Sequence, residues 1–286
     1  MERNVTTEEL VSRIGEFIKE RETTGLEENN TTNWGLVKFK QGAIENLLGP
    51  DEDQIFEYIT GLKDRYQPSS VNRIAHSIKI FFKWMVKRGY IEEQVIERFP
   101  RGLVSVPSKP IITFTQTEYE VLKKAAEGTR YYALIVIGWN TGMRLVDCAA
   151  LKWDEVDFVG GLIKKKPSKT EEHETVVEIP LTAELRELLE GLYQNRADEY
   201  INSLIAYKAM GGDLSKAFER FLKKQGLYEK GKTFHAFRRS AISRWLSHPN
   251  ADIMTVRHLS GHKNIKSLMP YFKPSMDKKK LLMDIE

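Results

Sequence analysis

The sequence predicts a mostly α-helical fold with a small antiparallel sheet, an α+β protein, divided into two domains. Apolar residues recur at helical spacing through most of the chain. Two β-like runs, Phe158–Ile163 and Thr175–Ile179, flank a long polar segment, which predicts a hairpin. The chain has 286 residues. Because a single domain usually holds about 100–150 residues, two domains are expected.

The first domain, residues 1–101, is expected to contain four helices. Thr6, Asn33 and Asp51 are residues of the N-cap type, and each precedes or opens an apolar periodic run. Pro68 opens the fourth and strongest pattern, because proline is favoured in the first turn of a helix. These signals predict a helical unit with one long, strongly amphipathic helix.

The predicted fourth helix has a cationic side. Its apolar face is formed by Ile74, Ile78, Phe81, Phe82 and Met85. Another face carries Lys79, Lys83 and Lys87 at four-residue spacing, and Arg73 precedes Lys79 by six residues. Six Lys or Arg residues and no acid occur from Arg65 to Tyr90. This local excess of one sign favours phosphate binding, and the alternative is an ordinary solvated face.

Residues 102–112 are predicted to form an extended linker, because this stretch holds two prolines and few charges. The second domain is predicted at residues 113–286. Beyond its hairpin, helical patterns are found at 117–126, 131–139, 183–193, 214–225, 236–246, 253–259 and 266–272.

Bulk properties narrow the class of protein. The chain has 44 Lys and Arg against 40 Asp and Glu, a formal net charge of +4, which is mildly basic. The single cysteine, Cys148, excludes an internal disulfide and a cysteine-based zinc site, and it is interpreted as a small core residue. We found no apolar run of about 20 residues and no signal-peptide core. A cytoplasmic protein that needs no metal or other cofactor is expected.

Five residues carry the side chains needed to attack a phosphodiester: Arg144, His235, Arg238, His262 and Tyr271. Such chemistry needs cations to neutralise phosphate oxygens, a positioned nucleophile and an acid for the leaving oxygen. An arginine can bind two phosphate oxygens at once, which a lysine cannot. Taken singly, each residue has a common structural explanation, such as a surface pair, a helix cap or packing. Their order and spacing favour a shared site.

Asp147 follows Arg144 by three residues. At that spacing it could orient the arginine by a charge-assisted hydrogen bond, although an ordinary surface pair of this kind is common.

The local sequences resemble the tyrosine recombinase (phage integrase, Xer-like) family. Thr141-Gly-Met-Arg-Leu-Val-Asp resembles the family's first arginine box, and His235-Ala-Phe-Arg-Arg-Ser-Ala resembles its HxxR box. Leu259-Ser-Gly-His-Lys-Asn resembles its LGH box, and Tyr271 is at the expected position of the nucleophile. The resemblance covers residues 113–273. It implies Arg144 and Arg238 as phosphate clamps, with His235 and His262 as hydrogen-bonding and proton-transfer partners.

The resemblance also implies a lysine on the hairpin that acts as general acid toward the 5′ oxygen. Ser168-Lys169-Thr170 resembles that position, so Lys169 is the candidate. The spacing from Lys169 to the following Ile179-Pro180-Leu181 is about three residues longer than the family pattern. Lys164, Lys165 and Lys166 therefore remain competitors, or phosphate contacts without a catalytic role.

A second departure is Ser260, which stands where the family more often has leucine or glycine. We interpret this departure as minor.

What the resemblance implies is a site-specific DNA recombinase that holds DNA in a two-domain clamp. Tyr271 would form a 3′-phosphotyrosyl intermediate and then a Holliday junction, in dimer resolution or in integration and excision of a mobile element. The expected partners are double-stranded DNA with paired half-sites and further copies of the chain, forming a tetramer. The sequence does not indicate accessory proteins. Because the chain begins with the core-binding helices, no additional arm-binding domain is expected.

Two alternatives are a catalytically silent DNA-binding regulator with this fold and an enzyme like a type IB topoisomerase.

Overall fold

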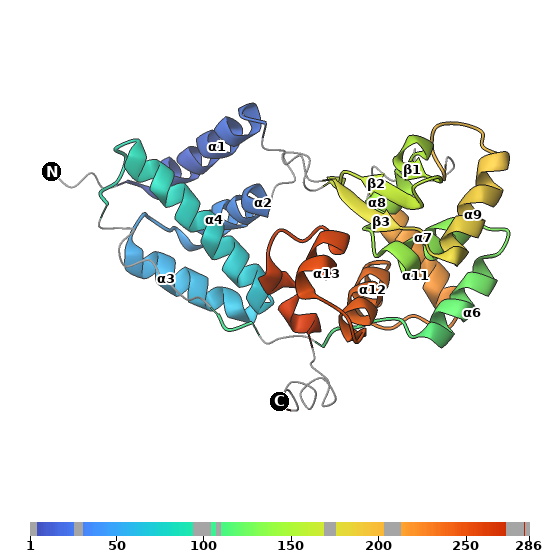
Figure 1. The fold of residues 1–286 in the computed structure, drawn as a ribbon. Helices are drawn as coiled ribbons and strands as arrows, with labels where there is room; N and C mark the ends of the chain where they lie inside the picture. The colour runs from blue at the N-terminus through green and yellow to red at the C-terminus, as the bar shows by residue number, and fades with distance from the viewer. Residues whose placement is uncertain are drawn as a thin grey trace. The chain divides into compact units, whose positions relative to one another are not determined.

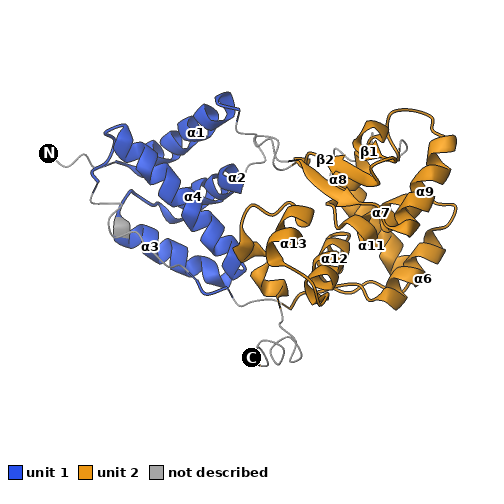
Figure 2. Ribbon diagram, in the orientation of Figure 1, with its two compact units in different colours: residues 1–109 blue, residues 110–286 orange. Residues whose placement is uncertain are grey.

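The computed structural model describes residues 5–25, 31–93, 104–106, 110–168, 176–202, 213–272 and 283. The chain divides into two compact units, residues 1–109 and residues 110–286 (Figure 2). The division falls within the linker predicted at residues 102–112.

The regular elements in the described part of unit 1 are all helices (Figure 1). Its elements are α1 (Thr7–Thr23), α2 (Thr31–Asn46), α3 (Glu52–Gly61), the short 3₁₀ helix η1 (Leu62–Asp64) and α4 (Pro68–Lys87). Thr6 caps α1 by accepting the backbone N–H of Glu9, and Asp51 caps α3 by accepting that of Gln54. Pro68 is the first residue of α4, where its missing N–H costs no helical hydrogen bond.

The N-cap predicted at Asn33 is wrong. Asn33 lies inside α2 and is buried, and its Oδ1 accepts a hydrogen bond from Nε of Arg21 on α1 at 2.8 Å. A partly buried guanidinium needs an acceptor, and the asparagine oxygen supplies it across two helices.

The core of unit 1 forms around α4. All the residues of its predicted apolar face are buried, and α2 packs closely against it. The rings of Phe39, Phe81, Phe82 and Trp84 lie within 5.5–6.4 Å of neighbouring rings in this core. The outer side of α4 carries Lys83 and Lys87 in exposed positions and Lys79 half-buried.

Unit 2 combines helices with a small sheet. Its helices are α6 (Gln116–Ala126), α7 (Tyr131–Thr141), α8 (Leu145–Ala149), α9 (Ala183–Gln194), α11 (Asp213–Lys224), α12 (His235–Ser247) and α13 (Ile253–Ser260). Short 3₁₀ helices occur at η2 (Trp153–Glu155), η4 (Ile265–Ser267) and η5 (Met269–Tyr271). The strands are β1 (Val156–Asp157), β2 (Leu162–Lys165) and β3 (Val177–Pro180).

The sheet is antiparallel in the order β1-β2-β3. The predicted hairpin is present, with Lys165 paired to Val177 at its distal end. The predicted strand 158–163 is wrong in its first half, because residues 158–161 form a turn that separates β1 from β2. Asp157 closes this turn by accepting the backbone N–H of Gly160 at 2.7 Å.

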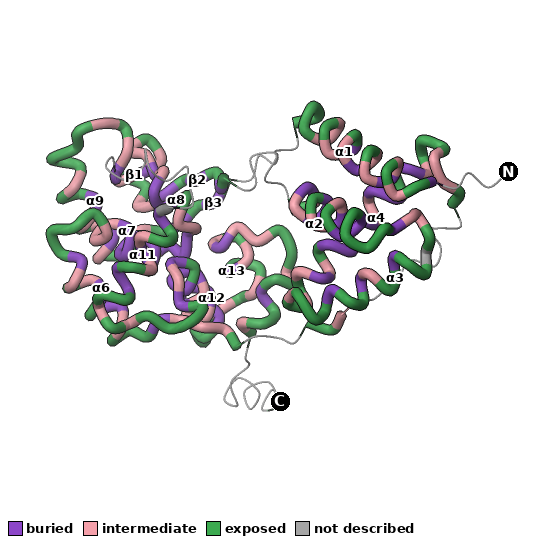
Figure 3. The backbone as a smooth tube through the Cα atoms, turned by 180° about the vertical axis from the view of Figure 1, so that it is seen from behind, coloured by how far each residue is buried: buried purple, intermediate pink, exposed green. Residues whose placement is uncertain are grey.

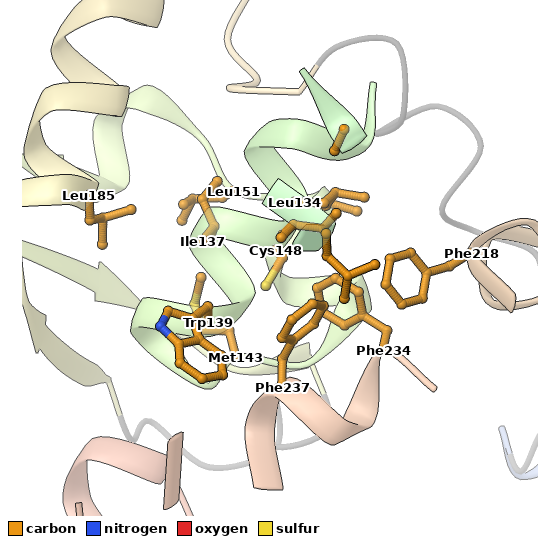
Figure 4. Close-up of a cluster of buried hydrophobic side chains, with 14 of the residues drawn as sticks. Leu134, Ile137, Trp139, Met143, Cys148, Leu151, Leu185, Phe218, Phe234 and Phe237 are labelled. Carbon is orange, nitrogen blue, oxygen red and sulfur yellow. The ribbon is translucent and has the colours of Figure 1, made fainter. Parts of the chain in front are cut away.

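Helix α7 lies at the centre of the unit 2 core. It is apolar on nearly all sides and buried from Leu134 to Trp139, as expected of an internal helix. Phe218 and Phe237 pack on Phe234 beside it, and Cys148 is fully buried in the same cluster (Figure 4). Burial is concentrated on the facing sides of these helices, and their outer sides are exposed (Figure 3).

The chain after α13 does not form the helix predicted at residues 266–272. It forms η4 and η5 instead. Pro270 lies within η5, and a proline cannot donate the backbone hydrogen bond that an α-helix needs in its interior. No helix in the described part of the chain is long and apolar enough to cross a membrane.

Two glycines of unit 1 should respond to alanine in opposite ways. A Cβ at Gly42 in α2 would lie 2.2 Å from the hydroxyl oxygen of Tyr58, whereas a Cβ at Gly61 meets no atom within 4 Å. Gly42→Ala should lower the free energy of unfolding by about 1–3 kcal/mol through overpacking. Gly61→Ala should raise it by about 0.5 kcal/mol through a less flexible unfolded chain. Urea unfolding followed by circular dichroism measures both, and equal stability of the two variants would contradict this packing.

Candidate active site

The turn that follows α7 positions the first arginine. Gly142 ends α7 in the left-handed region, with φ of 61°, and a Cβ there would lie 2.9 Å from that of Ala241 on α12. Glycine therefore permits both the turn and the close approach of the two helices. Two residues later, Arg144 is the N-cap of α8 and is partly exposed.

Arg238 joins three segments of unit 2. Its side chain, on α12, is 4% exposed, and its guanidinium donates to the carbonyl of Gly142 at 2.9 Å and to that of Ser260. These carbonyls lie at the carboxyl ends of α7 and α13, where helices leave acceptors unpaired and favour positive charge. Burial and the nearby Arg144 lower the pKa of Arg238 to about 10, so it stays charged at neutral pH.

Asp147 takes a different role from the one predicted. Its Oδ2 lies 3.8 Å from Nη1 of Arg144, which is too long for a hydrogen bond. Its Oδ1 accepts the backbone N–H of Ser168 at 3.0 Å. This buried carboxylate therefore holds the hairpin next to the predicted Lys169, and its attraction to Arg144 is a weaker ion pair.

His262 lies beyond the turn that ends α13. Gly261 forms the turn with φ of 62°, which glycine adopts without strain. Nδ1 of His262 lies 2.7 Å from Oγ of Ser260 and 3.4 Å from Nη2 of Arg238. Burial, followed by the charges of Arg238 and Arg144, lowers the pKa of His262 to about 4. The ring is therefore neutral at pH 7.

His235 and Tyr271 lie in the same part of unit 2. His235 is the first residue of α12, is exposed, and acts electrostatically on His262. Tyr271 ends η5, which packs against α12, and its ring contacts the cluster of Ile242, Leu246, Val256 and Leu268. Tyr271 and Arg238 also interact electrostatically. The structure thus brings together all five residues singled out for phosphodiester attack.

The hairpin lysines have different surroundings. Lys165 is 8% exposed, and its Nζ donates to Glu155 at 2.7 and 2.8 Å and to the carbonyl of Ala150 at 3.1 Å. This internal ion pair corrects the prediction that Lys165 contacts DNA or competes as the acid. Lys164 is exposed and 3.5 Å from Asp157, and Lys166 is exposed. Lys169 lies outside the described residues.

The predicted cationic side of α4 belongs to unit 1. Arg73 is exposed with its guanidinium carbon 5.6 Å from the ring centre of Trp34, and Lys83 and Lys87 are exposed beyond it. None of these side chains forms a salt bridge among those found in the described part of the chain. Their contact with DNA stays a prediction.

Ser260 is a site residue that our interpretation of the sequence missed. Its carbonyl binds Arg238 and its hydroxyl contacts His262. The available signal was its departure from leucine or glycine in a box that ends on a histidine. Among the described residues, no three His, Cys, Asp or Glu side chains form a group able to hold a metal ion.

Comparisons with known proteins identify the class. A model of the phage integrase family matches residues 113–278, more than half of the chain. Tyrosine recombinase XerC of Lactobacillus delbrueckii subsp. bulgaricus is 25% identical over 260 residues, which cover 84% of this chain and 86% of that protein. The XerC of Bacillus subtilis is 25% identical over 233 residues, 75% and 72% of the two chains.

Solved structures share the fold. A lambda integrase dimer bound to a COC′ core site has a TM-score of 0.70 at 21% identity, covering 94% of this chain and 78% of that one. The Tn1549 transposon integrase in complex with a circular intermediate DNA has a TM-score of 0.72 at 16% identity, covering 98% and 99%. The chain therefore belongs to the phage integrase family. It is a tyrosine recombinase, a DNA strand-exchange enzyme.

The lowered pKa of His262 has a measurable consequence for stability. Unfolded histidine has a pKa of 6.5, so between pH 6.5 and about 4 the unfolded chain binds a proton that folded His262 does not. The free energy of unfolding should therefore fall as the pH falls through this window. The ring is only half-buried, so screening by solvent should limit this loss to about 1 kcal/mol. His262→Gln should remove that part of the pH dependence, measured by urea unfolding at several pH values, and equal slopes for the two proteins would contradict it.

Proposed function

We propose that this enzyme performs site-specific recombination by attack of Tyr271 on a DNA phosphate. The bond to the 5′ oxygen breaks as the tyrosine oxygen binds phosphorus, which leaves a 3′-phosphotyrosyl link and a free 5′ hydroxyl. The 5′ hydroxyl of a second strand then attacks this link and releases the tyrosine, which produces a Holliday junction. The supporting observation is that Arg238 binds the ends of α7 and α13 beside Arg144, His262 and the element that carries Tyr271.

The two arginines suit different parts of phosphate binding. Arg238 uses two of its N–H groups within the protein, and the remaining donors of its guanidinium can bind a phosphate oxygen. Arg144 is only loosely paired at 3.8 Å and partly exposed, so it can reorient toward the phosphate. Two guanidinium groups next to a phosphate stabilise the negative charge of the transition state and of the attacking phenolate.

The histidines are proposed to supply a hydrogen-bond donor and proton transfer, and the hairpin lysine is proposed to supply the general acid. A neutral His262 can donate one hydrogen bond to a phosphate oxygen, and His235 at the start of α12 is proposed for proton transfer with Tyr271. Asp147 would fix the hairpin that carries Lys169, the proposed general acid toward the 5′ oxygen. The phosphotyrosyl bond conserves the energy of the phosphodiester, so the cycle needs neither ATP nor a metal.

We expect paired half-sites on double-stranded DNA, a tetramer of the chain in synapsis, and action in the cytoplasm. The lambda integrase relative is described as a dimer on a core site, which supports a half-site for each protomer. An enzyme that cleaves and reseals without strand exchange, or a silent regulator, would differ in its products. A nicked suicide substrate distinguishes them, because a regulator forms no covalent adduct and a topoisomerase-like enzyme forms no recombinant strands.

Tyr271→Phe tests the nucleophile. The variant should retain DNA affinity because the ring still packs against α12, and it should form no covalent adduct because the attacking oxygen is gone. Denaturing gel electrophoresis of labelled suicide substrates measures the adduct. Tyr193 and Tyr228 are each 39% exposed and are the alternative nucleophiles. Peptide mapping of wild-type adducts, which identifies the tyrosine that is linked to DNA, is therefore the matched control. An adduct on either residue, or one that survives Tyr271→Phe, would overturn the assignment.

The salt dependence of binding tests the cationic side of α4. Each lysine that neutralises a phosphate contributes about 0.9 to the slope of log K against log salt concentration. Replacing Lys79, Lys83 and Lys87 by alanine should therefore reduce the slope by up to about 2.7. Fluorescence anisotropy at a series of salt concentrations measures it, with Lys216→Ala on unit 2 as a single-charge control. An unchanged slope would mean that these lysines form a solvated face.

A further inference from the structure

Ser260 contacts two residues of the candidate site through two different atoms. It is the last residue of α13 and is 4% exposed. Its carbonyl accepts a hydrogen bond from Nη2 of Arg238, while its Oγ lies 2.7 Å from Nδ1 of His262. Removing only the hydroxyl would therefore leave the anchor of Arg238 in place, and the effect on His262 can be measured separately.

The hydroxyl hydrogen of Ser260 has two candidate acceptors. Nδ1 of His262 is 2.7 Å from Oγ, and the carbonyl oxygen of Arg257 is 3.2 Å away. If the hydrogen points to Nδ1, the ring accepts and its proton is on Nε2. If it points to Arg257, the ring must carry its proton on Nδ1 to bond Ser260. The Oγ–Nδ1 distance of 2.7 Å favours the first arrangement, because hydroxyl donors bond at about 2.7–2.8 Å and N–H donors at about 2.9–3.0 Å.

Arg238 favours the same arrangement independently. Its Nη2 lies 3.4 Å from Nδ1 of His262, and a guanidinium has donors but no acceptor. A proton on Nδ1 would face both an N–H group and a positive charge, whereas a lone pair there is attracted by both. The ring is neutral at pH 7 and has one N–H, so this N–H belongs on Nε2.

We propose that Ser260 is a positioning residue that holds His262 in the Nε2–H tautomer and in a fixed ring orientation. Its consequence for catalysis rests on the proposed function. An Nε2–H group can donate to a phosphate oxygen of the scissile bond, while a bare Nε2 lone pair would repel that oxygen. Since the donor is set before DNA binds, no reorganisation of the ring is needed as negative charge develops.

The tautomer can be read directly in the DNA-free protein. Long-range ¹⁵N–¹H correlation spectra of histidine-labelled protein at pH 7 distinguish Nε2–H from Nδ1–H. Wild-type His262 should be in the Nε2–H form. Ser260→Ala should raise the share of the Nδ1–H tautomer, because only the longer 3.4 Å contact with Arg238 then opposes it. Ser240→Ala is the matched control and should leave the tautomer of His262 unchanged. Ser240 is also buried, but its hydroxyl forms hydrogen bonds with backbone atoms of Phe114 and Ala236. An Nδ1–H form in the wild type, or an identical tautomer in Ser260→Ala, would overturn the proposal.

Single-turnover cleavage of a suicide substrate tests the consequence. Ser260→Ala should lower the rate of adduct formation about 10–100-fold, the loss typical when a metal-bound histidine loses its orienting partner, with unchanged DNA affinity. Ser260→Thr keeps the hydroxyl and should retain most of the rate. A normal rate in Ser260→Ala, or a threonine variant as slow as the alanine variant while equally folded by circular dichroism, contradicts the proposal. If wild-type protein forms no adduct, the proposed function fails, and the spectra without DNA still decide the role of Ser260.

Discussion

The buried guanidinium of Arg238 is the interaction on which the candidate site depends. A charge taken out of water is costly unless hydrogen bonds replace its hydration. Here the carbonyls of Gly142 and Ser260 replace it, and both lie at the carboxyl ends of helices, where unpaired acceptors and the helix dipole favour a cation. One side chain on α12 thereby fixes the ends of α7 and α13. The turns to Arg144 and His262 begin at these two points.

The same buried charge sets the electrostatics around it. Burial lowers the pKa of His262, and the charge of Arg238 lowers it further. Arg144 in turn lowers the pKa of Arg238, after burial. Two arginines near one another repel, and an arriving phosphate relieves this repulsion. The arrangement is therefore less favourable without an anion than with one. This is what the proposed phosphodiester site requires.

Much of the fold was predictable because it follows from local patterns. The amphipathic period of α4, the apolar α7 and the caps at Thr6 and Asp51 depend on neighbours within one or two turns. The errors have a different origin. Asn33 accepts a hydrogen bond from Arg21 on another helix instead of capping its own helix. Lys165 forms an ion pair with Glu155 instead of contacting DNA from the hairpin. A local pattern cannot show which distant group will form a hydrogen bond or an ion pair with a polar side chain.

The sequence by itself was enough to predict which residues perform the chemistry, because residue type, order and spacing are known without coordinates. It predicted Arg144, His235, Arg238, His262 and Tyr271 as members of one site. Only the tertiary structure decided how they are held. Asp147 bonds the backbone of the hairpin rather than Arg144, and Ser260, interpreted as a minor departure, contacts His262. These contacts form between helix ends and turns that are far apart along the chain. The packing of the core brings these segments close together.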